Sequence, residues 1–117
     1  YGPTLLSEAI EASKILLKSY DFSLKVINLP WLNNIDRNWI RDEVNNFSTI
    51  FTLDYHYLDF AIGTVIASTL SKLKMDHHIK IESIGLNEIP SCGQNKEVLE
   101  LHKLDTQNIV SKILSSL

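Results

Sequence analysis

The spacing of apolar residues predicts helices that alternate with extended segments. Over residues 4–20 apolar side chains recur every three or four positions, which is typical of an amphipathic helix. Thr4 is a suitable N-cap for this helix, because its hydroxyl can accept from a backbone N–H of the first turn. Residues 23–29 predict a strand, which Pro30 ends because proline has no backbone N–H to donate to a ladder.

The middle of the chain predicts a helix followed by a buried strand. Asp36 is a suitable N-cap for a helix over 37–46, and the residues between Pro30 and Asp36 are expected to form a loop. Residues 48–54 are an almost continuous apolar run. Such a run indicates a strand that is covered on both faces, as in parallel sheets.

The second half of the sequence repeats this alternation. A helix is expected over 59–73, in which the small residues Ala61, Gly63 and Ala67 allow a close approach to a neighbouring backbone. Residues 79–84 alternate between apolar and polar side chains, as a half-exposed strand does. The remaining expected elements are a loop over 85–93, a short helix over 95–103, and a last helix over 106–117 that Asp105 caps.

The order of these elements predicts an α/β fold. Strands that alternate with helices are connected by crossovers, so we expect a three-layer α/β/α sandwich with a mostly parallel, mixed sheet. Residues 1–117 would form a single domain whose core strands include 24–28, 49–54 and 79–84. Because the first element is a helix, we also expect a strand ahead of Tyr1. The 117 residues would then be excised from a longer chain and lack its first strand.

Composition narrows the classes of function. The formal net charge is −3, so the chain lacks the broad basic surface that is typical of proteins that bind nucleic acid. Cys92 is the only cysteine, which excludes an internal disulfide and fits a reducing compartment. No apolar run approaches the roughly 20 residues that cross a bilayer. We therefore expect a cytoplasmic protein whose partners are neither nucleic acids nor membranes.

Asp54 and His56 are the best candidates for chemistry. They follow the most apolar strand, and ligands collect at the carboxyl ends of strands in parallel α/β sheets. Alternate residues of a strand share a face, so the carboxylate could orient the imidazole for general acid–base catalysis. The alternative is a structural histidine at a strand end or an interface. We favour this alternative, because one such pair does not specify a reaction.

The remaining candidates carry less chemistry. Cys92 lies in a predicted loop and no histidine is paired with it in the sequence, so a loop thiol is favoured over a nucleophile. His77 and His78 are adjacent, whereas zinc ligands are usually spaced more widely, so a solvated turn is favoured over a metal site. Neither a G-x-G-x-x-G motif nor a Walker loop is present. No residue is therefore assigned to catalysis, to cofactor binding or to a metal.

Taken in order, the landmarks of the sequence resemble the C-terminal domain of transketolase-like, thiamine diphosphate-dependent enzymes. The landmarks are Glu8-Ala9 and Glu11-Ala12, Val26-Ile27-Asn28-Leu29-Pro30, Asp36 and Ile40, Asp54-Tyr55-His56, Gly63 and Ala67, Gly85 and Gly93, and Leu104-Asp105 with Ile109 and Ile113. The resemblance covers essentially the whole chain. It departs at Asp54 and Tyr55, where the family often has two glutamates, and at Phe60-Ala61, where it usually has a glycine pair.

The resemblance implies a mixed sheet of about five strands between helices. It also implies a parent enzyme that transfers two-carbon ketol units between sugar phosphates, with thiamine diphosphate and Mg²⁺ held mainly by two other domains. This domain would bind no cofactor and would serve assembly. Its partners would be other domains of the same polypeptide and a second copy in a homodimer. Asp54, His56 and Gly63 would lie at a domain interface or at the edge of a site.

Two alternatives to this function stay open. The first is a non-catalytic docking or assembly module. The second is the equivalent domain of a deoxyxylulose phosphate synthase or of a 2-oxo acid dehydrogenase β subunit, where the resemblance implies that the domain also helps to dock a partner.

Overall fold

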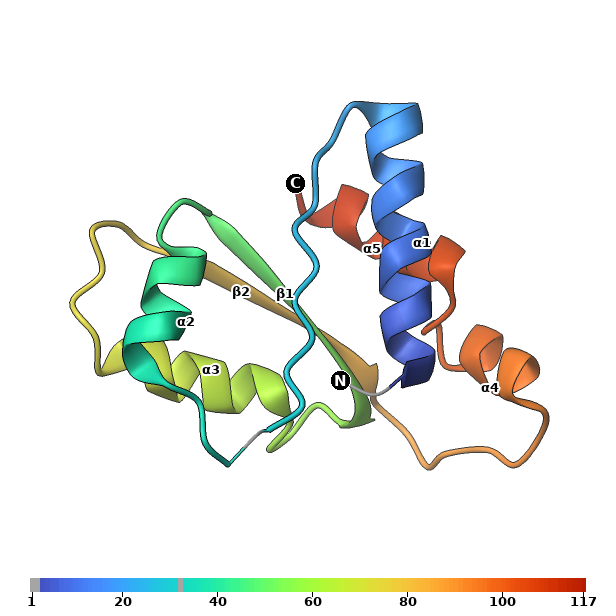
Figure 1. The fold of residues 1–117 in the computed structure, drawn as a ribbon. Helices are drawn as coiled ribbons and strands as arrows, with labels where there is room; N and C mark the ends of the chain where they lie inside the picture. Colours follow the sequence, from blue (N-terminus) through green and yellow to red (C-terminus); the bar gives the residue numbers. More distant parts are fainter. Residues whose placement is uncertain (1–2, 32) are drawn as a thin grey trace.

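The computed structural model of the protein describes residues 3–31 and 33–117 (Figure 1). Helices and strands alternate from α2 to α4, as the sequence predicts. The elements are α1 (Pro3–Tyr20), α2 (Arg37–Val44), β1 (Thr49–Tyr57), α3 (Ile62–Ser71), β2 (Lys80–Leu86), α4 (Asn95–Leu101) and α5 (Thr106–Ser116). Tyr1 and Gly2 at the start of the chain lie outside the described residues. Leu32 of the predicted loop also lies outside them.

The sheet consists of β1 and β2, which run parallel. Thr49 lies opposite Lys80, and the register continues without a break to Leu53 opposite Ile84. It then becomes irregular before Tyr57 meets Leu86. The sheet of the described residues is therefore purely parallel and two-stranded, and the expected mixed sheet is not observed.

Helices pack on both faces of this sheet (Figure 1), as the α/β class requires. Phe51, Leu53 and Tyr55 of β1 point towards α1, α4 and α5. The alternate residue Ile50 packs with α2 and α3 on the opposite face. The buried core residues on the first side are Leu5, Ala12, Leu16, Leu99, Leu104, Ile109, Val110 and Ile113, and those on the second side are Ile40, Val44, Ile62, Ile66 and Leu70.

The strand predicted over 23–29 is wrong as secondary structure. These residues are extended but pair with neither strand of the sheet. Their side chains still alternate as in a strand, because Leu24 packs towards α1 and α5 while Leu29 packs towards α2 and α3. The side chains of this segment thus alternate as in a strand, but a ladder also needs a neighbouring backbone at hydrogen-bonding distance, which sequence periodicity does not supply.

The predicted helix caps have mixed outcomes. Asp36 caps α2 as expected, since its Oδ1 accepts from the backbone N–H of Trp39 at 2.8 Å. Thr4 is not a cap, because α1 already includes it. Asp105 occupies the N-cap position of α5 without capping it, because its Oδ1 accepts instead from Nδ2 of Asn108. The first N–H of α5, that of Thr106, donates to Glu8 of α1 at 2.7 Å.

Gly63 allows α3 to lie against the sheet. A Cβ atom at this position would stand 2.1 Å from Oγ of Ser83 and 2.9 Å from Oγ1 of Thr52. These two hydroxyls lie on neighbouring strands and are hydrogen-bonded to each other at 3.0 Å. The close approach predicted for the small residues of this helix is therefore confirmed at Gly63, whereas Ala67 is exposed.

Candidate functional site at the carboxyl ends of the strands

The carboxyl ends of β1 and β2 meet at one edge of the sheet. Tyr57 is the last residue of β1 and lies opposite Leu86, the last residue of β2. The backbone N–H of Leu58 then donates to the carbonyl of Leu86 at 3.1 Å, which ties the turn after β1 to the end of β2. Residues that follow either strand are thus presented on the same side of the molecule.

Asp54 is a buried structural carboxylate at this edge. Only 1% of its surface is exposed, and its Oδ2 accepts from the backbone N–H of Ile62 at 2.9 Å. Ile62 is the first residue of α3, where N–H groups lack partners within the helix and the helix dipole favours a negative charge. Asp54 therefore anchors the start of α3 to the end of β1. Its other oxygen, Oδ1, is buried without a hydrogen-bond partner among the described residues.

His56 is exposed and does not form the hydrogen-bonded pair with Asp54 that catalysis would use. The irregular register between Leu53 and Tyr57 disturbs the simple alternation on which the pairing was predicted. Among the described residues, the one hydrogen bond of the Asp54 carboxylate goes to the helix backbone. This arrangement supports the structural interpretation of His56 over general acid–base catalysis.

Large apolar side chains are exposed at the end of β1 and in the segments that follow the two strands. Tyr57 is 48% exposed, Phe60 is 93% exposed, and Ile89 after β2 is 81% exposed. Phe60 has a φ of 65°, a left-handed backbone conformation that is uncommon for a residue with a side chain. It occupies the turn between β1 and α3, where the resemblance expects glycine. We call His56, Tyr57, Phe60 and Ile89 the carboxyl-edge surface.

The other titratable candidates make local contacts. Nε2 of His77 lies 2.9 Å from the carbonyl oxygen of Phe47, and His78 is exposed. Cys92 is an exposed free thiol. The nearby His102 is engaged elsewhere, since its Nε2 accepts from the backbone N–H of Ser91 at 3.1 Å. The surroundings of His77 and His78 agree with a structural turn, and the exposure of Cys92 agrees with a loop thiol.

Within residues 3–31 and 33–117, no group of three or more His, Cys, Asp or Glu side chains is placed to hold a metal ion. Asp54, the carboxylate in the best position, already binds the first N–H of α3. No reaction step is therefore assigned to a cofactor held by this domain alone.

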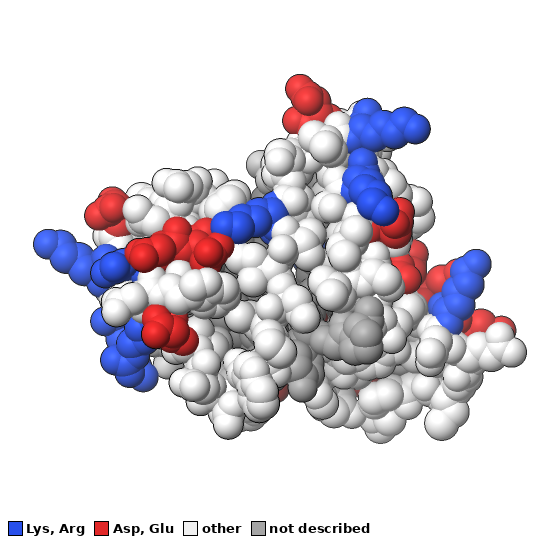
Figure 2. Space-filling view, in the orientation of Figure 1, with Lys and Arg blue, Asp and Glu red and all other residues white. Residues whose placement is uncertain are grey.

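The charges of the molecule surround a face that is largely uncharged. Figure 2 shows acidic and basic side chains over α2 and along α1 and α4, while the middle and lower part of this view is mostly uncharged. That part includes much of the extended segment after α1. Within the described residues, no helix combines the length and apolar character needed to cross a membrane.

Comparison with known proteins decides the family. The family described as "Transketolase, C-terminal domain" matches residues 1–109. The chain belongs to this family. The transketolase C-terminal domain is also similar to a solved structure titled "Split gene transketolase, inactive beta4 tetramer", with a TM-score of 0.80 and 21% sequence identity. The match covers 95% of this domain and 35% of the other chain. The domain thus spans about a third of that relative.

The likeness to the solved structure confirms the α/β fold of the transketolase C-terminal domain. Sequence reasoning named Asp54, His56 and Gly63 as interface or site-edge residues. In the structure Asp54 accepts from Ile62, His56 is exposed, and Gly63 lies against Ser83 and Thr52. Sequence reasoning missed the bond between Asp54 and Ile62 and the exposed Phe60. The signal for Phe60 was available, because an aromatic residue at a turn position where the family usually has glycine indicates a retained surface side chain.

Proposed function

We propose that this domain is the C-terminal assembly domain of a thiamine diphosphate-dependent, transketolase-like enzyme that transfers two-carbon ketol units between sugar phosphates. In this proposal the domain does not catalyse the reaction itself. Thiamine diphosphate and Mg²⁺ bind to other domains of the enzyme. The carboxyl-edge surface packs against those domains or against a second subunit of a homodimer.

The carboxyl-edge surface is the observation that carries this proposal. Exposed aromatic and aliphatic side chains are enriched in the centres of protein interfaces, where they are removed from water. Phe60 is held outward by a backbone conformation that costs free energy, which fits a side chain retained for contact rather than for the stability of the isolated domain. The solved relative adds that such a domain occurs within a longer chain, of which the match covers 35%.

The experiment compares assembly and turnover in the complete enzyme. His56→Ala and Phe60→Ser are introduced, and each variant is examined by sedimentation and by a ketol-transfer assay. We expect both changes to weaken assembly, with activity falling only in proportion to the unassembled fraction. A large fall in the rate with assembly intact would assign a catalytic role to the edge and would overturn the proposal.

Titration of the 117-residue chain tests the cofactor part of the proposal. Calorimetry with thiamine diphosphate and Mg²⁺ is expected to show no saturable binding, because the domain presents neither a phosphate loop nor a metal-ligand cluster in its described part. Saturable binding in the micromolar range would contradict this expectation. It would leave the assembly role to be judged by the sedimentation experiment alone.

A further inference from the structure

Residues 87–94 connect β2 to α4, and each of them is exposed. Figure 1 shows this segment running outward from the sheet and turning back into α4. Two contacts hold the segment against the helix. Gly93 lies against Val98, since a Cβ atom at Gly93 would stand 3.3 Å from Cγ2 of Val98. The backbone N–H of Ser91 donates to Nε2 of His102, the C-cap residue of α4, at 3.1 Å.

The bond between Ser91 and His102 attaches the segment to the domain. Among the described residues, no other hydrogen bond joins residues 87–93 to the rest of the chain. The His102 side chain is only 3% exposed. A buried polar atom almost always has a hydrogen-bond partner, and Ser91 is the partner of Nε2. The position of the segment and the burial of the imidazole therefore depend on the same bond.

The direction of this bond fixes the protonation state of Nε2. A backbone N–H can only donate, so Nε2 must accept and carries no proton. The neutral ring then has its proton on Nδ1, which lies 3.9 Å from Oε1 of Glu88, beyond hydrogen-bond distance. A proton added to Nε2 would place two donors opposite each other. The added proton and the bond to Ser91 therefore exclude each other.

Glu88 is the acidic group that faces the imidazole. Its side chain is 72% exposed, so solvent screens its contact with Nδ1. Among the described residues, no other acidic side chain forms an ion pair with this ring. The charged side chains of α4 itself, and Lys103 directly after His102, are exposed. The charged residues of the neighbouring elements are bound to other partners: Glu8 to Thr106, Asp105 to Asn108, and Lys80 to Glu82.

We propose that His102 is a pH-sensitive latch, in which a proton on Nε2 releases residues 87–94 from α4. With Nε2 unprotonated, Ser91 is bound and the segment is closed over the ring. With Nε2 protonated, the bond is lost and a buried positive charge is left without a hydrogen-bond acceptor, which is costly until the ring reaches water. Histidine suits such a switch, because it ordinarily changes charge between about pH 5 and pH 8. The latch does not depend on the proposed function.

NMR titration of the 117-residue chain tests the latch. Between about pH 8 and pH 5 we expect the Ser91 amide proton and the His102 ring signals to titrate with one midpoint. Protection of the Ser91 amide against hydrogen exchange, measured relative to an unstructured peptide at the same pH, should fall at least tenfold across this midpoint. A Ser91 amide that stays constant while the ring titrates would overturn the proposal. A ring that stays neutral throughout the range would overturn it as well.

His102→Gln is the matched variant, because its side-chain oxygen can accept from Ser91 and does not titrate. We expect the Ser91 amide of this variant to keep its protection over the whole range. His77→Gln is the control, since Nε2 of His77 contacts the carbonyl of Phe47 instead. The pH dependence at Ser91 should persist in the control, and its loss there, or its persistence in His102→Gln, would contradict the latch. If His102→Gln does not fold, the titration of the unchanged chain still decides.

The latch reaches the carboxyl-edge surface through Ile89, which lies two residues before Ser91 in the released segment. This consequence rests on the proposed function. Sedimentation of the complete enzyme should show that assembly weakens between about pH 8 and pH 5 more in the unchanged protein than in His102→Gln. Equal pH dependence in the two proteins would overturn the link to assembly. The NMR titration would still decide the latch, and Phe60→Ser would still decide the assembly role of the surface.

Discussion

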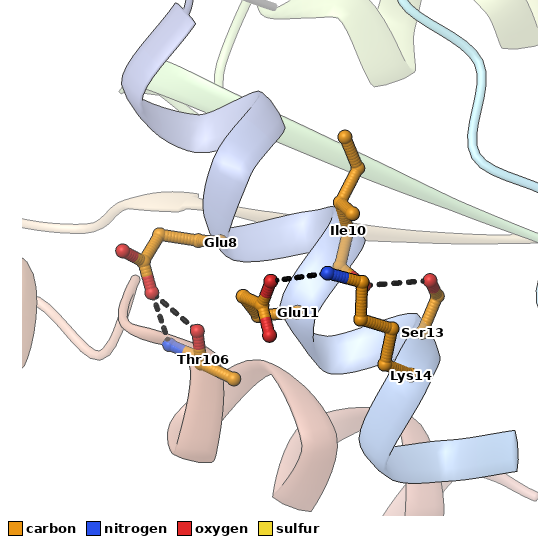
Figure 3. Close-up of polar contacts among 6 residues, drawn as sticks. All are labelled: Glu8, Ile10, Glu11, Ser13, Lys14 and Thr106. Carbon is orange, nitrogen blue, oxygen red and sulfur yellow. Dashed lines mark hydrogen bonds and ion pairs between the residues drawn. The ribbon is translucent and has the colours of Figure 1, made fainter. Parts of the chain in front are cut away.

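Glu8 of α1 binds Thr106 at the start of α5, although 98 residues separate them in the sequence. Its Oε2 accepts from the backbone N–H of Thr106 at 2.7 Å and from the hydroxyl Oγ1 of the same residue (Figure 3). The carboxylate thus satisfies the first N–H of α5, a helix whose N-cap residue Asp105 makes no side-chain capping bond. This contact fixes the two helices that cover one face of the sheet relative to each other.

We expect Glu8→Ala to lower the free energy of unfolding by about 1–3 kcal/mol, because it leaves a helix N–H and a hydroxyl without their charged acceptor. Denaturant unfolding followed by circular dichroism measures the change. Glu11→Ala is the matched control on the same helix. Glu11 pairs with Lys14 on the exposed surface (Figure 3), so its loss should cost less than about 1 kcal/mol. Equal effects of the two changes would contradict a special role for Glu8.

Gly63→Ala should destabilise the domain by about 1–3 kcal/mol, because the added methyl group meets Oγ of Ser83. The gain in helix propensity, at most about 1 kcal/mol, opposes this cost. Ser83→Ala removes the closest atom, so the double variant should be more stable than the sum of the single changes predicts. A double-mutant cycle by chemical denaturation measures this coupling. Additive effects would show that the helix moves away from the sheet instead.

Leu53→Ala is expected to destabilise by about 1–3 kcal/mol in the 117-residue chain, which is less than the 2–5 kcal/mol typical of a fully buried leucine. Leu53 packs against two clusters of the core but is only partly buried, and it borders an apolar cavity. Urea unfolding of the unchanged chain and of Leu53→Ala measures this difference in the free energy of unfolding. A loss below about half a kcal/mol would indicate that β1 contributes little to the core.

Lys80 should control the titration of Glu82. The hydrogen bond from Lys80, 2.9 Å from the carboxylate, and then its positive charge hold the pKa of Glu82 below its usual range, and Lys112 adds to this effect. Because the folded state lowers this pKa, the stabilisation is present above the unfolded pKa and is lost as the pH falls through the folded one. We expect Lys80→Met to raise the pKa of Glu82 measured by NMR titration. Lys112→Met should raise it less, and the reverse order would contradict this assignment.

The sequence by itself determined the local elements of this protein. Helical spacing of apolar residues located α1, the Asp36 side chain predicted the start of α2, and the apolar run at 48–54 located β1. The ordered landmarks from Glu8 to Ile113 also identified the family that the comparison then confirmed. These features depend on neighbours within a few residues, or on a fixed order of motifs, and a linear pattern contains both kinds of information.

Only the tertiary structure decided which segments meet. The sequence predicted a strand over 23–29, but pairing depends on a neighbouring backbone at the right distance, and the structure leaves a cavity there. It placed Asp54 beside His56, yet the carboxylate turns to the first N–H of α3 because that group lacks a partner within its helix. Glu8 accepts from the first N–H of α5 for the same reason. Hydrogen bonds between distant segments follow from the three-dimensional packing of helices on the sheet. The local periodicity of apolar residues therefore does not predict them.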